Sequence, residues 1–136
     1  MSWDVSIFKF AKRHVTVEAI PKDERPLVMG SRAEVHSRVS QAFPGTDWTD
    51  PSWGDWDSEA GSIEFNLGKE EPADGMMLHV RAGSAVVPRI ISMCIANGWQ
   101  ALDCSSGEFL EKSINTTASI EQWQTFRDQI VRDSDA

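Results

Sequence analysis

The sequence predicts an α+β fold, in which helices cover one face of a single-layer antiparallel sheet. Apolar residues alternate along short segments, as in half-buried strands, at residues 3–10, 62–67 and 76–81. They recur at helical spacing in longer segments, at residues 31–43, 87–96 and 119–131. With a further strand at 99–103, the elements follow the ferredoxin-like (split βαβ) order, to which a C-terminal hairpin arm and helix are added.

The first helix and the hairpin after it have clear local signals. Ser31 and Glu34 have the spacing of a capping box, which marks the beginning of a helix, and Pro44-Gly45 ends it. The alternating segments Ser62–Leu67 and Met76–Arg81 are joined by a turn that contains proline and Asp-Gly. We therefore expect these two segments to pair as an antiparallel hairpin.

The second half of the chain completes the predicted fold. Pro88 is tolerated only in the first turn of a helix, and Asn97-Gly98 is a helix stop, so a helix is expected near 87–96. Its predicted buried face consists of Val87, Ile91 and Cys94/Ile95. Strands are expected at 99–103 and 108–110, and the last helix at 119–131 has an apolar stripe of Ile120, Trp123, Phe126 and Ile130. Residues 1–136 are predicted to form a single domain with a frayed tail at 132–136.

Composition and charge exclude several classes of function. The chain has 136 residues and a formal net charge of −8, so it lacks the basic footprint of a nucleic-acid-binding protein. No apolar run approaches the roughly 20 residues of a membrane span, and the first residues do not resemble a secretory signal. We therefore expect a cytoplasmic protein with reduced cysteines, Cys94 and Cys104, that does not bind membranes.

The segment Asp47–Glu59 holds three tryptophans and five acidic residues, and its Asp-Pro and Trp-Gly pairs predict an irregular loop. Tryptophan is enriched at binding hot spots, and an acidic rim would steer a basic partner. The predicted partner-binding residues are Asp47, Trp48, Asp50, Trp53, Asp55, Trp56 and Asp57. The alternative is that some of the tryptophans turn inward and anchor the loop. The aspartate spacing does not match a calcium-binding loop, so no metal is expected.

A second candidate site lies on the sheet face away from the apolar residues. Strand alternation places Glu64, His79 and Arg81 on that face, where Asp4 and Asp103 could join them. A carboxylate, an imidazole and a guanidinium on adjacent strands could form an acid/base site. They could equally be structural cross-strand pairs, or lie under the C-terminal helix. No nucleophile motif or phosphate-binding glycine loop is evident, so no cofactor is expected.

Three stretches resemble blocks of a known group of proteins. They are PSWGDWDSEAGSIEFNLG, MLHVRAG and GWQALDCSSGEFL. They resemble blocks of small, acidic bacterial proteins of unassigned function, although Ala82 replaces the glycine expected after the arginine. In size and charge, but not in motif, those proteins are similar to immunity proteins, which bind and neutralise toxins. The resemblance implies a bacterial cytosolic protein and no particular chemistry.

These observations favour a non-enzymatic protein-binding module over a catalyst. Small size, acidity and a tryptophan-rich acidic segment suggest an immunity protein that binds a basic partner, namely a cognate toxin domain. Two alternatives stay open: a small enzyme that uses Glu64, His79 and Arg81, and a structural subunit that self-associates. The sequence does not fix the oligomeric state.

Overall fold

The computed structural model describes residues 2–110, so the predicted C-terminal helix and tail lie outside the described residues. The elements, in chain order, are β1 (Trp3–Lys9), η1 (Val17–Ala19), α1 (Arg32–Ala42), β2 (Asp47–Asp50), β3 (Trp53–Ser58), β4 (Gly61–Asn66), β5 (Met76–Ala82), α2 (Val86–Asn97), β6 (Trp99–Asp103) and β7 (Glu108–Phe109). Among the described residues, no helix is long and apolar enough to cross a bilayer.

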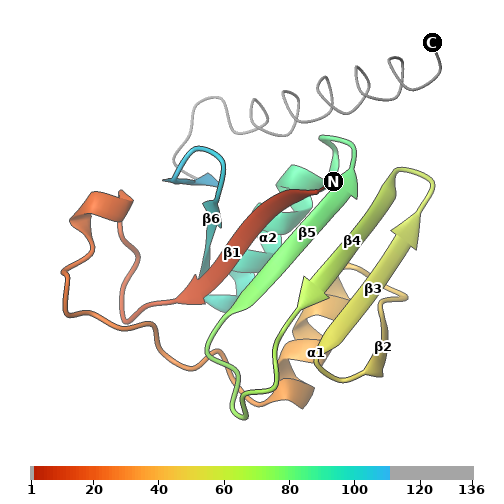
Figure 1. Ribbon diagram of the computed structural model, residues 1–136, viewed down its shortest axis with the longest axis horizontal. Helices are drawn as coiled ribbons and strands as arrows, with labels where there is room; N and C mark the ends of the chain where they lie inside the picture. The colour runs from red at the N-terminus through yellow and green to blue at the C-terminus, as the bar shows by residue number, and fades with distance from the viewer. Residues whose placement is uncertain (1, 111–136) are drawn as a thin grey trace.

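The strands form one antiparallel sheet with the order β2-β3-β4-β5-β1-β6-β7. Both helices lie on one face of it, behind the sheet in Figure 1. The predicted α+β class, the single antiparallel sheet and the β4–β5 hairpin are therefore confirmed. The sheet has seven strands, and its order extends well beyond the four strands of a split βαβ unit. We call the face opposite α1 and α2 the outer sheet face.

The hydrophobic core lies between the sheet and the two helices. Alternate residues of each central strand point into it, which gives the strands their period of two. Buried core residues of the strands include Trp3, Val5, Ile7, Ile63, Phe65, Leu78 and Val80. The capping box of Ser31 and Glu34 is present at the beginning of α1, as predicted. Gly98 ends α2 in the left-handed conformation, where glycine has no steric cost.

The predicted buried face of α2 was partly wrong. Its buried residues are Val86, Val87, Ile90, Met93 and Cys94. Ile91 only flanks the core, and Ile95 is 59% exposed. The buried stripe runs at i, i+3/i+4 spacing through Val86 and Val87, Ile90, and Met93 and Cys94, so Ile91 and Ile95 lie beside it rather than on it.

The prediction of an irregular loop at 47–59 was also wrong, because most of this segment forms the β2–β3 hairpin. The carboxylate of Asp50 accepts hydrogen bonds from the backbone N–H and hydroxyl of Ser52, at 2.9 and 2.7 Å, which fixes the connecting turn. β3 then pairs with β4 along its whole length. The turn signal of Pro51 is therefore correct, since Pro51 lies between the two strands, whereas sheet pairing overrides the loop signal of Gly54.

Gly54 explains how the hairpin packs on α1. A side chain at this position would lie 2.8 Å from the ring of Trp48, so only glycine leaves room for the indole. The Trp48 ring in turn stacks on His36 of α1, with ring centroids 4.0 Å apart. His36 also donates from Nε2 to the carbonyl oxygen of Pro51 at 2.8 Å. These contacts hold the hairpin to the helix layer.

The long connection after β1 covers one end of the outer sheet face. Gln100 on β6 is buried, and its amide accepts from His14 N at 2.9 Å and donates to His14 O at 3.0 Å. The ring of His14 is bonded to Glu24 at 2.7 Å. This clamp fixes the connection over β6.

Candidate functional site

A row of ionisable residues crosses the outer sheet face. In register, Asp47 of β2 pairs with Asp55 of β3, Asp55 with Glu64 of β4, Glu64 with His79 of β5, and His79 with Asp4 of β1. Residues directly opposite each other in antiparallel strands have their side chains on the same face. We call these five residues the cross-strand row. It unites the two sites predicted from the sequence on one surface.

His79 is held from two sides. Its Nδ1 lies 2.9 Å from Oδ1 of Asp4, which accepts the hydrogen bond, and the hydroxyl of Ser2 donates to the same oxygen at 2.6 Å. The ring of Trp53 stacks on the imidazole, with centroids 5.6 Å apart and planes 19° from parallel. Trp53 is therefore presented on the outer sheet face in a fixed orientation.

Asp4 is expected to make the folded protein less stable as the solution becomes acidic. Burial would raise the pKa of Asp4, but hydrogen bonds from Ser2 and His79, with the charges of His79 and Arg81, lower it below 3.8. Because the pKa of Asp4 is lower in the folded protein, its carboxylate stabilises the fold at pH values above the ordinary pKa of 3.8. This stabilisation is lost as the pH falls through the lower folded-state pKa. Thermal melting over a pH series spanning 3.8 should show a shallower acid decline for Asp4→Asn than for wild type. Parallel curves would contradict this assignment.

Glu64 and His79 face each other in register but bind different partners. Glu64 forms an ion pair with Arg81, whereas His79 binds Asp4. The three residues of the predicted acid/base site are thus close together, but the carboxylate and the imidazole are not bonded to each other. Asp103, which could have joined them, is buried on the helix side, where it accepts from Trp3 Nε1 at 3.0 Å.

The three tryptophans of the hairpin divide between the two faces of the sheet. Trp56 is buried in the core and meets Phe43 edge to face, with centroids 5.1 Å apart. Trp48 is half-buried against His36 on the helix side. Only Trp53 lies on the outer sheet face, so the candidate surface keeps one of the three tryptophans as a contact residue.

The four aspartates of the hairpin also have different roles. The pKa of Asp47 is lowered by hydrogen bonds from the hydroxyl and backbone N–H of Thr49, and the pKa of Asp50 by those from Ser52. Both aspartates therefore stabilise turns. The side chains of Asp55 and Asp57 are exposed and make no hydrogen bond or ion pair with any other residue among 2–110.

The outer sheet face thus combines a fixed aromatic ring with a series of carboxylates, of which the side chains of Asp55 and Asp57 have no partner among residues 2–110. Along the cross-strand row, three carboxylates follow one another on adjacent strands, at Asp47, Asp55 and Glu64. Like charges directly opposite each other destabilise a sheet.

Within the described range, no group of three or more His, Cys, Asp or Glu side chains is arranged to hold a metal ion.

Comparison with known proteins finds no match for the chain. No protein-family model matches it, and neither a curated protein nor a solved structure is significantly similar. The resemblance to small bacterial proteins therefore stays a prediction, and any function has to be argued from the site itself.

Proposed function

We propose that this chain is a non-enzymatic protein-binding module that holds a basic partner against the outer sheet face. The observation that carries the proposal is the arrangement of Trp53, fixed on His79, on the same face of β3 as the unpaired carboxylates of Asp55 and Asp57. A rigid aromatic ring provides contact area at low entropic cost, and the surrounding charge steers a partner of opposite sign. The binding site in this proposal consists of Trp53, Asp55, Asp57 and Glu64.

Two features support binding rather than a purely structural role. The like charges of the cross-strand row work against folding, and such conflicts are typical of functional surfaces. The chain as a whole carries a net charge of −8, which favours association with a cationic surface and disfavours phosphate backbones.

The specific role that we propose is immunity: the partner is a cognate toxin domain, and binding neutralises it. Many enzymes that cleave nucleic acids have cationic active sites, and an acidic surface with a central tryptophan could block such a site directly. This role rests on charge, size and surface chemistry, together with the resemblance described above.

A small enzyme is the second candidate, and one observation favours it. Asp4 orients His79 through Nδ1, and Nε2 has no partner among the described residues, which is the arrangement of an oriented general base. Against it, Glu64 is bonded to Arg81. In addition, the hollow between the helices and the hollow beside η1 contain none of Glu64, His79 and Arg81. A loss of turnover in His79→Gln, with the fold retained, would support the enzyme over the binding module.

A finer assignment of the fold is also part of this proposal. We infer that β4, β5, β1 and β6, with α1 and α2, form a ferredoxin-like core to which the β2–β3 hairpin and β7 are added. The chain order β1-α1-β4-β5-α2-β6 and the central position of β5 and β1 support it. In this arrangement the hairpin widens the outer sheet face and brings Trp53 to it.

Co-expression tests the proposed function. The reading frame next to this gene is expressed inducibly, with and without a tagged copy of this protein, and growth and co-purification are measured. We expect growth arrest without the protein, and rescue together with a stable complex when it is present. A harmless neighbour that forms no complex would contradict the immunity role. Self-association, the third alternative, is tested by the mass of the pure protein in solution, and a monomer would exclude it.

A further inference from the structure

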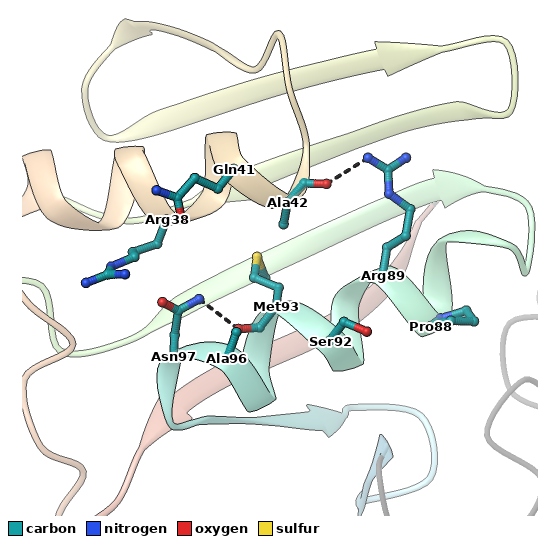
Figure 2. Close-up of a pocket in the computed structure, with 9 residues that line it drawn as sticks. All are labelled: Arg38, Gln41, Ala42, Pro88, Arg89, Ser92, Met93, Ala96 and Asn97. Atoms are coloured by element: carbon teal, nitrogen blue, oxygen red, sulfur yellow. Dashed lines mark hydrogen bonds between the residues drawn. The ribbon is translucent and has the colours of Figure 1, made fainter.

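A groove between α1 and α2 lies on the opposite side of the sheet from the cross-strand row. It has a volume of about 390 Å³, and its walls come from the facing sides of the two helices. Figure 2 shows Arg38 and Ala42 on one wall and Arg89, Met93 and Asn97 on the other. Met93 is buried and gives the groove an apolar floor.

Arg89 is held rigidly at one end of this groove. Its Nη2 donates to the carbonyl oxygen of Ala42 at 2.7 Å, and its guanidinium lies 4.7 Å from the ring centroid of Phe43 and 5.0 Å from that of Trp56. These contacts fix the plane of the guanidinium while the residue stays exposed. A fixed guanidinium loses little entropy when it binds a carboxylate.

Arg38 lies toward the other end of the groove, as Figure 2 shows. Its side chain is exposed and makes no hydrogen bond or ion pair with any residue among 2–110. Past Arg38, a second hollow of about 220 Å³ continues to Lys9 and Trp99 and also contacts Asn97. The two hollows are adjacent, because Arg38, Ala96 and Asn97 line both of them, and together they are called the combined groove.

The charge of the combined groove is opposite to that of the whole chain. It has three cationic residues, Lys9, Arg38 and Arg89, and one carboxylate, Glu34. That carboxylate is the reciprocal partner in the capping box, where it accepts from the backbone of Ser31 at 3.4 Å. In a protein with a net charge of −8, this groove is complementary to an anionic ligand.

We propose that the groove between α1 and α2 binds an acidic peptide segment of a protein partner. Carboxylates of the segment bind Arg89 and Arg38, and an apolar side chain between them packs on Met93 and Ala42. Guanidinium groups match carboxylates in planar, bidentate geometry, and a groove between two helices accepts a peptide lengthwise. This surface goes beyond the proposed function, because it lies on the other side of the sheet and binds an acidic segment, whereas the outer sheet face binds a basic partner.

Titration followed by NMR tests this inference without any basic partner. The probe is the peptide acetyl-Glu-Glu-Leu-Glu-Glu-amide at low salt, and its glutamine analogue is the neutral control. We expect saturable shifts of backbone amides in α1 and α2 and of the Arg89 side-chain N–H with the acidic peptide only. Absence of saturable shifts, shifts confined to other elements, or equal shifts with the glutamine peptide would overturn the proposal.

Two variants separate the groove from general charge effects. Arg38→Glu should weaken the acidic peptide roughly tenfold or more, or about 1.4 kcal/mol. Arg25→Glu makes the same charge change at an exposed position in the connection after β1, outside the groove, and should leave affinity unchanged. The amide spectrum of each variant reports its fold, and Arg38→Gln provides a milder substitution. Equal weakening by Arg25→Glu would overturn the assignment to this groove.

Discussion

Replacing both Asp55 and Asp57 with lysine is expected to weaken the basic partner roughly a hundredfold, or about 2.8 kcal/mol. Both carboxylates are exposed on the outer sheet face, on the same side of β3 as Trp53, and neither has a partner within residues 2–110. The lysines would place positive charge where the partner brings its own, and like-charge contact across an interface is strongly unfavourable.

The same double variant should leave the free protein at least as stable as wild type. Lysine at position 55 would lie opposite Glu64 on β4 and next to Asp47 on β2, so two repulsive pairs become attractive. Calorimetric titration gives the affinity, and thermal melting gives the stability. A surface retained for binding should thus show opposite effects on the two quantities.

A charge-matched control separates the surface from net charge. Asp23→Lys/Asp74→Lys changes the net charge equally at exposed positions outside the cross-strand row. We expect it to retain most of the affinity, because salt weakens the effect of exposed charges that do not contact the partner directly. If the control weakened the partner as much as Asp55→Lys/Asp57→Lys, the assignment of the binding site to the outer sheet face would be wrong.

Gly61→Ala is expected to lower the free energy of unfolding by roughly 3 kcal/mol. Gly61 follows the turn between β3 and β4 and has φ of +127°, a conformation that a residue with a side chain rarely adopts. An added Cβ would also lie 2.2 Å from the carbonyl oxygen of Arg81 and 2.6 Å from Cα of Ala82. Both atoms belong to the backbone of β5, which is paired on both sides and has no room to move.

Gly68→Ala is the matched control for Gly61→Ala. Gly68 has φ of +77°, and an added Cβ would meet nothing within 4 Å. Its replacement should lower the free energy of unfolding by only about 1 kcal/mol, because alanine disfavours a positive φ. Chemical denaturation of the two variants gives the difference, which isolates the clash with β5. Equal losses would contradict the close approach of Gly61 to β5.

Much of the fold follows from short-range patterns in the sequence. The alternation in β1, β4 and β5, the capping box of Ser31 and Glu34, and the Asn97-Gly98 stop predict elements that the structure contains. The hairpin at 47–58 could not be predicted in this way. Its strands are short, Gly54 and Pro51 are loop signals, and its stability comes from pairing with β4 and from packing of Trp48 over Gly54.

The sequence predicts which sheet face carries the candidate site, but not which of its side chains bind each other. Strand alternation alone places Glu64, His79 and Arg81 together on the outer sheet face. Which of them bind each other depends on register, and the register pairs Asp4 with His79. The division of the tryptophans between the two faces depends on the missed hairpin, so the sequence could not separate Trp53 from Trp48 and Trp56.

The groove could not be predicted from sequence patterns. Arg38 and Arg89 are far apart along the chain, and each would be an ordinary solvated cation on the exposed side of its helix. They line one groove because α1 and α2 pack side by side on the same face of the sheet (Figure 1).

The most direct test of the binding surface is a survival measurement with the toxic partner. Cells that express the partner are given wild-type protein, Asp55→Lys/Asp57→Lys, or the groove variant Arg38→Glu, at equal soluble levels. We predict that wild type and Arg38→Glu restore growth and that Asp55→Lys/Asp57→Lys does not. Full protection by a folded Asp55→Lys/Asp57→Lys protein would contradict the claim that the outer sheet face binds and neutralises the partner.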